Sequence, residues 1–139
     1  MEKFLLTNDE KQELNSSLCL IADNMEQLVV HFYQNFLHEK NLKLIKQNTN
    51  ESLINMFSSS LSMIISQIEH PFSIQEYFRI LLMKHPDFIT MMEDKNLFQQ
   101  SLMNALIDVF GVNYSERLGN LWYRAVSNYI NEFENYIND

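Results

Sequence analysis

Glycine, proline and cysteine are scarce in this chain, which has two glycines, two prolines and one cysteine among 139 residues. So few turn-forming residues argue against β-sandwiches, barrels and glycine-rich phosphate-binding loops, and they favour a few long helices. A single thiol cannot form an internal disulfide, so we expect a reduced, cytoplasmic protein. Cys19 lies on the apolar side of the first expected helix, which predicts a buried structural thiol.

Basic residues and long apolar runs are also few. The chain has 10 Lys and Arg against 18 Asp and Glu, so its net charge is −8 and nucleic acid is not an expected partner. No apolar run approaches the length of a membrane span, and the first residues turn polar too early for a signal peptide. Aromatic residues and methionine are abundant, with ten Phe, six Tyr and eight Met, which is typical of a well-packed core.

Apolar residues recur at helical spacing along most of the chain, and no segment alternates as a strand would. The apolar stripes run over residues 14–21, 25–36, 53–68, 74–85, 97–109 and 118–137, with a short apolar element at 42–45. Pro71, Pro86 and Gly111 stand where stripes end, as expected for helix terminators. The length and the pattern together predict one all-α domain, residues 1–139, of six or so helices packed across one another.

The sequence holds no arrangement typical of hydrolytic catalysis or of a structural zinc site. The four histidines, His31, His38, His70 and His85, are scattered, and neither HxxxH nor CxxC occurs. His85 differs from the others because it continues an inward-facing stripe and stands directly before Pro86. An inward imidazole is either hydrogen-bonded to a backbone carbonyl or a ligand of a haem iron, and the residues alone leave both open.

The stretch from His85 to the C-terminus resembles the bacterial single-domain globins and the globin part of flavohaemoglobins. It reads Lys84-His85-Pro86-Asp87-Phe88, then Ser101-Leu102-Met103-Asn104-Ala105-Leu106, then Leu121-Trp122-Tyr123-Arg124-Ala125. Upstream, His31-Phe32-Tyr33-Gln34-Asn35-Phe36-Leu37 is similar to the second helix of those globins, and residues 42–57 look more like the bacterial sensor globins. The resemblance covers about residues 10–137, and where globins place a phenylalanine against the porphyrin this chain has Ile45 or Lys46.

This resemblance implies a globin-like fold of about six to eight crossed helices that binds haem b. It implies His85 as the iron ligand, Tyr33 as a donor to the bound gas, Leu53 and Phe57 as an apolar wall, and Phe32 and Phe88 as further cofactor contacts. The implied function is reversible binding of dioxygen, or of another diatomic gas such as nitric oxide or carbon monoxide, for oxygen binding, transport or sensing.

Two other functions stay open at this point. One is nitric oxide dioxygenation, in which a separate reductase would return the iron to the ferrous state, since 139 residues hold no reductase domain. The other is a haem-free globin-like signalling module, which resembles the sensor domains of some bacterial stress-response proteins and acts through helix-to-helix contacts in a homodimer. In either case, the electron donor or signalling partner is expected to be a separate molecule.

Overall fold

The computed structural model describes residues 6–40, 50–69, 74–86 and 88–138, apart from the side chains at 37–40, 50, 52, 53 and 67–69. The helices are α1 (Asn8–Asp23), α2 (Met25–Lys40), α3 (Asn50–Glu69), α4 (Gln75–Lys84), α5 (Phe88–Met92), α6 (Lys95–Phe110) and α7 (Glu116–Asn138), with a 3-10 turn, η2 (Gly111–Asn113), before α7. These described ranges hold seven α-helices and no strand, which confirms the predicted all-α, globin-like class.

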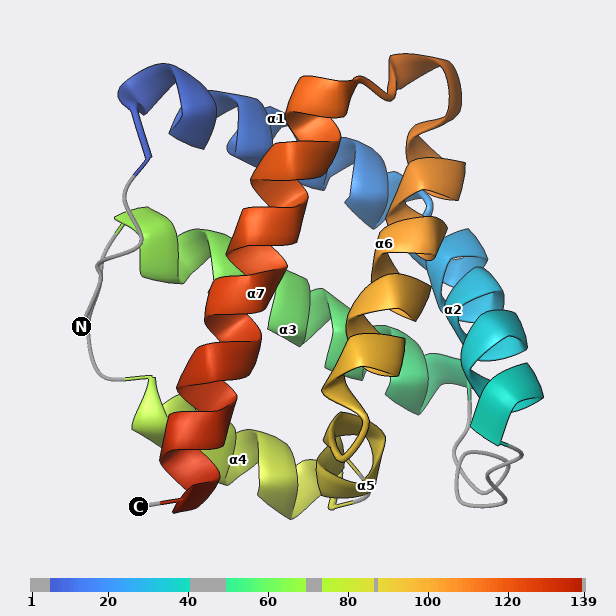
Figure 1. Ribbon diagram of the computed structural model, residues 1–139, viewed down its shortest axis with the longest axis vertical. Helices are drawn as coiled ribbons and strands as arrows, with labels where there is room; N and C mark the ends of the chain where they lie inside the picture. The colour runs from blue at the N-terminus through green and yellow to red at the C-terminus, as the bar shows by residue number, and fades with distance from the viewer. Residues whose placement is uncertain (1–5, 41–49, 70–73, 87, 139) are drawn as a thin grey trace.

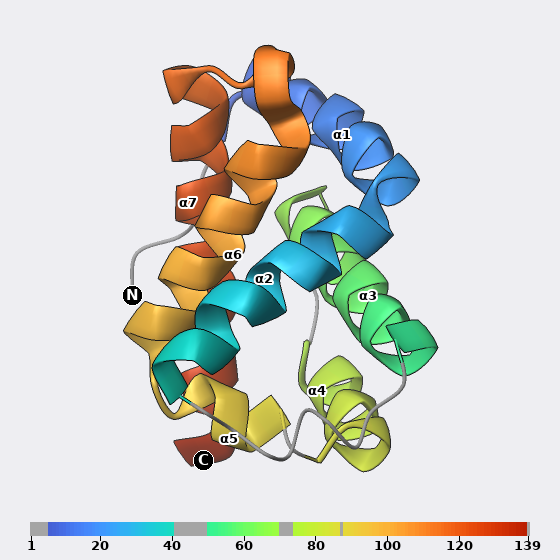
Figure 2. The same cartoon turned by 90° about the vertical axis from the view of Figure 1, so that its right-hand side faces the viewer.

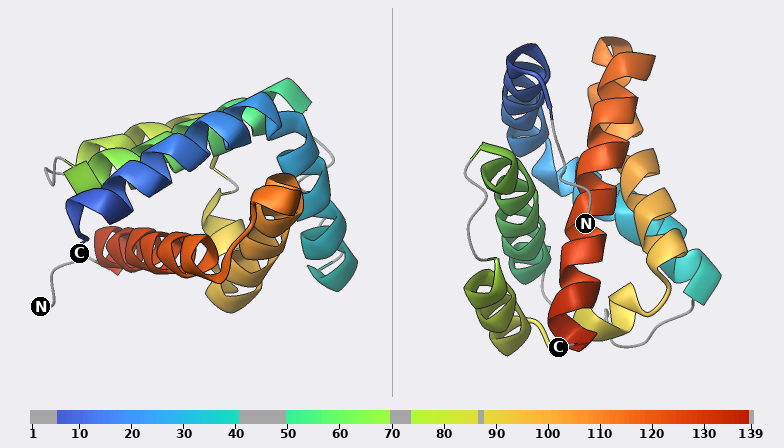
Figure 3. Two further views of the ribbon diagram at one scale, coloured as in Figure 1. Left: turned by 90° about the horizontal axis from the view of Figure 1, so that it is seen from above. Right: turned by 60° about the vertical axis from the view of Figure 1, so that its left-hand side comes forward.

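The helices form two crossed layers, and Figure 1 shows α7 passing in front of α1 and α3. Helices α6 and α7 lie side by side in one layer, while α1 and α3 lie side by side in the other (Figure 3). Helix α2 crosses α6 along one edge of the molecule (Figure 2). The short helices α4 and α5 close the end near the C-terminus of α7, so the apolar stripes of all the helices meet in one core.

Two helix ends follow directly from local sequence. Asp94 caps the start of α6, because its Oδ1 accepts a hydrogen bond from the Leu97 N–H at 3.1 Å. The same helix ends at Gly111, which has a φ of +52° that L side chains rarely adopt. Gly111 therefore ends α6 as its sequence position predicted.

A buried hydrogen bond fixes how α7 crosses α1. The indole Nε1 of Trp122, whose side chain is fully buried, donates to the Ser17 Oγ at 2.8 Å. The Ser17 hydroxyl donates in turn to the Leu14 carbonyl oxygen at 2.7 Å. Because a buried N–H must find an acceptor, this serine sets the position of the tryptophan against α1.

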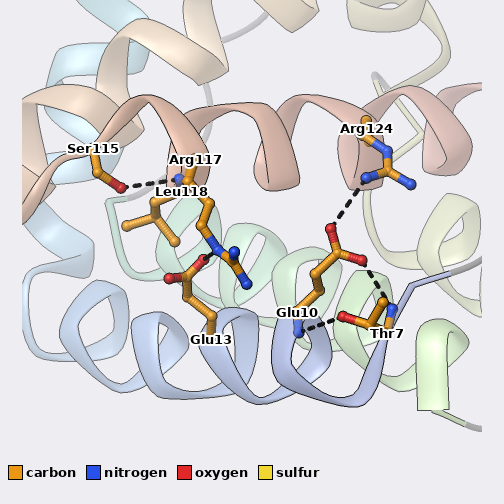
Figure 4. Close-up of polar contacts among 7 residues, drawn as sticks. All are labelled: Thr7, Glu10, Glu13, Ser115, Arg117, Leu118 and Arg124. Atoms are coloured by element: carbon orange, nitrogen blue, oxygen red, sulfur yellow. Dashed lines mark hydrogen bonds and ion pairs between the residues drawn. The ribbon is translucent and has the colours of Figure 1, made fainter.

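Charged side chains join the same two helices at the surface. Thr7 and Glu10 form a capping box at the start of α1, with the Thr7 N–H donating to Glu10 Oε1 at 2.8 Å. The Glu10 carboxylate also lies 3.5 Å from the Arg124 guanidinium of α7, and Arg117 pairs with Glu13 at 3.1 Å (Figure 4). Exposed ion pairs of this kind contribute little each, so the buried Trp122–Ser17 hydrogen bond stabilises this contact more than they do.

One prediction about α1 is wrong, because Cys19 is exposed rather than buried. The core-facing residues of α1 are Leu14, Ser17 and Ile21. Cys19 stands two residues from both Ser17 and Ile21, about 200° away around the helix. A serine takes the inner position because the Trp122 indole needs an acceptor there.

Candidate functional site

His85 stands between α4 and α5, where it is partly buried. Its backbone N–H donates to the Leu81 carbonyl at 2.8 Å, and its own carbonyl accepts from the Phe88 N–H at 3.0 Å. The residue has left the helical conformation, with φ −137° and ψ 71°, because the Pro86 ring disfavours that conformation at the preceding position. His85 therefore lies at the rim of the core, at the end of α4.

Tyr33 lies in α2 and points into the core, with only 7% of its surface exposed. Its hydroxyl donates to the Met91 sulfur of α5, at 3.8 Å. Methionine sulfur is a weak acceptor, so this contact is mainly one of packing. The hydroxyl that the resemblance assigns to a bound gas thus lies against a side chain of the segment that follows His85.

Three further predicted residues lie close to Tyr33 or to its aromatic neighbours. The Phe32 ring lies 5.1 Å from Tyr33, 4.8 Å from Phe57 and 5.5 Å from Phe98, measured between ring centroids. Phe88 lies on the other side of Phe98, at 6.0 Å. The structure therefore brings Phe32, Tyr33 and Phe57 into direct contact, and the Phe98 ring links Phe88 to Phe32.

Leu53 belongs to α3, but its side chain lies outside the described residues. Ile45 and Lys46, the predicted corner beside the porphyrin, also fall outside them. The same holds for His70 and for the side chain of His38. The sequence does not fix the register between Lys40 and Leu53, and residues 41–49 lie outside the described part of the chain.

A hydroxyl cluster that the sequence analysis missed joins α3, α4 and α7. The Tyr77 hydroxyl lies 3.1 Å from the Ser60 Oγ and 3.2 Å from the Tyr129 hydroxyl, which lies 3.2 Å from the same Ser60 Oγ. Burial raises the pKa of Tyr129 well above 10, and the neighbouring Tyr77 raises it further. The sequence shows a tyrosine, Tyr77 or Tyr129, in each of two predicted helices. Nothing in the sequence indicates that both tyrosines contact the same serine, Ser60.

An open hollow of about 430 Å³ lies at the surface between α2 and α6. It is lined by Glu26, Gln27, Val30, His31, Gln34 and Asp108. Gln27 bridges the two helices by donating from Nε2 to Asp108 Oδ2 at 2.9 Å, and the His31 Nδ1 lies 3.2 Å from the Asn35 amide nitrogen. A hollow this open to solvent would bury little of a planar cofactor, whereas cofactor sites enclose most of the ligand.

Neither a protein-family model nor a curated protein nor a solved structure matches this chain. The functional assignment therefore depends on the residues themselves. In the described part of the chain, no three His, Cys, Asp or Glu side chains gather closely enough to hold a metal ion. Nor do the described helices include one with the length and apolar content needed to cross a membrane.

The described residues allow a test of whether a haem fits. The resemblance places Tyr33 and His85 on opposite faces of a porphyrin, so the cofactor would separate Tyr33 from the segment after His85. In the structure, Tyr33 instead contacts Met91 of that segment directly. Other protein atoms already cover the rings assigned to the cofactor, since Phe57 is 2% exposed and Phe88 is 1% exposed. These side chains fit a self-filled core and do not fit a porphyrin between Tyr33 and α5.

Proposed function

We propose that this chain is a haem-free, globin-like helical module that acts through contacts of its helices with another protein molecule. The observation that carries the proposal is the contact between Tyr33 of α2 and Met91 of α5, at 3.8 Å. It joins the two sides of the core that a cofactor would hold apart.

An unbroken series of rings supports this proposal, because it runs through the interior with one ring from each of six helices. The series is Phe57 (α3), Phe32 (α2), Phe98 (α6), Phe88 (α5), Phe133 (α7) and Phe78 (α4), with successive centroid distances of 4.8, 5.5, 6.0, 5.1 and 5.1 Å. All these distances lie within the range of favourable aromatic pairs. The abundant phenylalanine of the sequence is thus used to fill the core.

A module with a filled interior acts through its surface. The chain carries a net charge of −8, and several large apolar side chains are exposed on different helices, among them Met83 of α4 at 71% and Tyr123 of α7 at 54%. Scattered apolar residues of this kind are normal on a protein surface, so they do not single out one face. The partner is either a second copy of the chain or a separate signalling protein.

Haemin titration of the purified full chain, followed by its absorption spectrum, tests the proposal. We expect no saturable 1:1 complex, and no change on reduction and addition of carbon monoxide beyond that of haemin in buffer alone. His85→Ala and the control His31→Ala should give the wild-type result. A 1:1 complex with an intense violet band that His85→Ala abolishes and His31→Ala keeps would contradict the proposal.

Gas binding by a haem-containing globin is the second candidate function, with nitric oxide dioxygenation as its enzymatic form. The observation that favours it is the place of His85, partly buried at the end of α4 in an arrangement of crossed helices. The same titration separates the two candidates. Nitrate production with an added reductase would then be measured only on a chain that holds haem.

A further inference from the structure

Helix α4 is short and has no side-chain cap at its start, and its local side-chain support is the exposed Glu76–Arg79 ion pair. It has ten residues, and its N-cap residue, Ile74, makes no side-chain capping hydrogen bond, whereas α1 and α6 both have such caps. Isolated helices shorter than about 12–15 residues are marginal in water, so α4 depends on its packing. It lies across the C-terminal end of α7, where the Phe78 ring packs on Phe133 at 5.1 Å and on Tyr129 and Tyr136 at 5.5 Å each (Figure 1).

The hydroxyl cluster ties α4 to two other helices at once. Tyr77 of α4 meets Ser60 of α3 at 3.1 Å and Tyr129 of α7 at 3.2 Å. Each of the three hydroxyls has one proton to donate and can accept at least one hydrogen bond, so together they can satisfy one another. Removal of one of these hydroxyls leaves the other two without that hydrogen-bond partner. A buried polar group that loses its partner lowers the free energy of unfolding.

Helices α4 and α5 are two separate helices and not one continuous helix. Pro86 keeps His85 out of the helical conformation, so α4 ends there whatever its surroundings. Helix α5 has anchors of its own, because Met91 contacts Tyr33 and Phe88 packs on Phe133 at 5.1 Å. Helix α4 can therefore leave its place without pulling α5 out of the core.

We propose that α4 opens as a unit while the other helices stay folded, and that the Tyr77 hydroxyl is the latch that holds it closed. Opening uncovers the part of the fully buried Phe133 of α7 on which the Phe78 ring lies, at 5.1 Å, while Phe88 of α5 stays packed on Phe133. It thereby creates an apolar surface that is absent from the closed form. This inference rests on the proposed function, for which it names the moving part.

Hydrogen exchange of the full chain, measured helix by helix with mass spectrometry, tests this opening. In the wild type, amides of α4 should exchange at least about tenfold faster than those of α6 and α7, because local opening requires less free energy than global unfolding. Tyr77→Phe keeps the ring but removes the hydroxyl, so exchange in α4 should rise about threefold to tenfold with α6 and α7 unchanged. Tyr123→Phe, the control, removes an exposed hydroxyl from α7 and should change nothing.

Ser60→Ala removes the hydroxyl of α3 to which the Tyr77 hydroxyl is hydrogen-bonded. Ser60 belongs to α3, so faster exchange in α4 of this variant would show that the hydroxyl cluster, and not the local sequence of α4, holds the helix. Equal exchange of α4, α6 and α7 in the wild type would overturn the proposal, as would an equal effect of Tyr77→Phe on all three or no effect of Ser60→Ala on α4. The proposed function fails on a different result, the haemin titration, so the two failures are distinguishable.

Discussion

Replacement of Ser17 with alanine removes the acceptor of the Trp122 indole N–H and leaves that N–H fully buried. A buried donor that loses its partner costs about 1–3 kcal/mol. With an unfolding entropy of about 2.1 cal/mol/K per residue, a chain of 139 residues loses about 3 °C of Tm for each kcal/mol. Ser17→Ala should therefore lower the Tm by about 3–10 °C.

The matched control is Ser16→Ala, at an exposed position of the same helix. Both substitutions gain the same helix propensity, so the difference between them reports the lost hydrogen bond. Thermal unfolding gives the Tm of both variants and urea unfolding gives their free energies of unfolding. Both are followed by circular dichroism, which stays usable when Trp122, the single tryptophan, is itself replaced.

A double-mutant cycle makes the test specific to this pair. In a Trp122→Phe background there is no indole N–H to satisfy, so Ser17→Ala should cost at least about 1 kcal/mol less than it does in the wild type. The reasoning is refuted if Ser17→Ala and Ser16→Ala differ by less than about 0.5 kcal/mol, or if the cost of Ser17→Ala is the same in both backgrounds.

Three further predictions concern the core, a helix end and pH. Phe32→Ala removes a fully buried ring that contacts four others, so it should lower the free energy of unfolding by about 3–5 kcal/mol, and a urea midpoint close to that of the wild type would contradict this. Gly111→Ala meets no neighbouring atom, yet it should cost about 1 kcal/mol of thermal stability because of its φ of +52°, and Gly111→Asn should cost less. The Thr7 backbone N–H, helped by the Arg124 guanidinium, lowers the pKa of Glu10 below 4.5. Glu10 therefore adds stability above pH 4.5 that is lost as the pH falls through its folded-state pKa, and Glu10→Gln should flatten that part of a Tm-against-pH curve.

The sequence predicted the helices because their signals are local. Pro86 and Gly111 end helices through their own backbone restrictions, and the apolar stripes follow from the helical repeat. Helix α5 was not predicted, because five residues are too few to show a repeat. The burial of Cys19 was predicted wrongly. The buried face of α1 includes the polar Ser17, which accepts from the Trp122 indole, and a search for apolar residues does not place a serine on that face.

The candidate site was less accessible to sequence reasoning, because it depends on contacts between distant segments. Tyr33 and Met91 are 58 positions apart, and no local pattern predicts that they meet. The same holds for Tyr77 and Ser60, which come from different helices. The sequence identified the aromatic residues of the interior, but only the fold shows that they fill it themselves.

An NMR measurement on the purified full chain tests most directly whether Tyr33 and Met91 close the core. The methionine methyl groups are labelled with carbon-13, and Met91→Leu assigns the signal of Met91. We predict a nuclear Overhauser contact between the Met91 methyl and the Tyr33 ring, and no change in the Met91 signal when haemin is added. No such contact, together with a Met91 signal that shifts stoichiometrically with haemin, would contradict the claim.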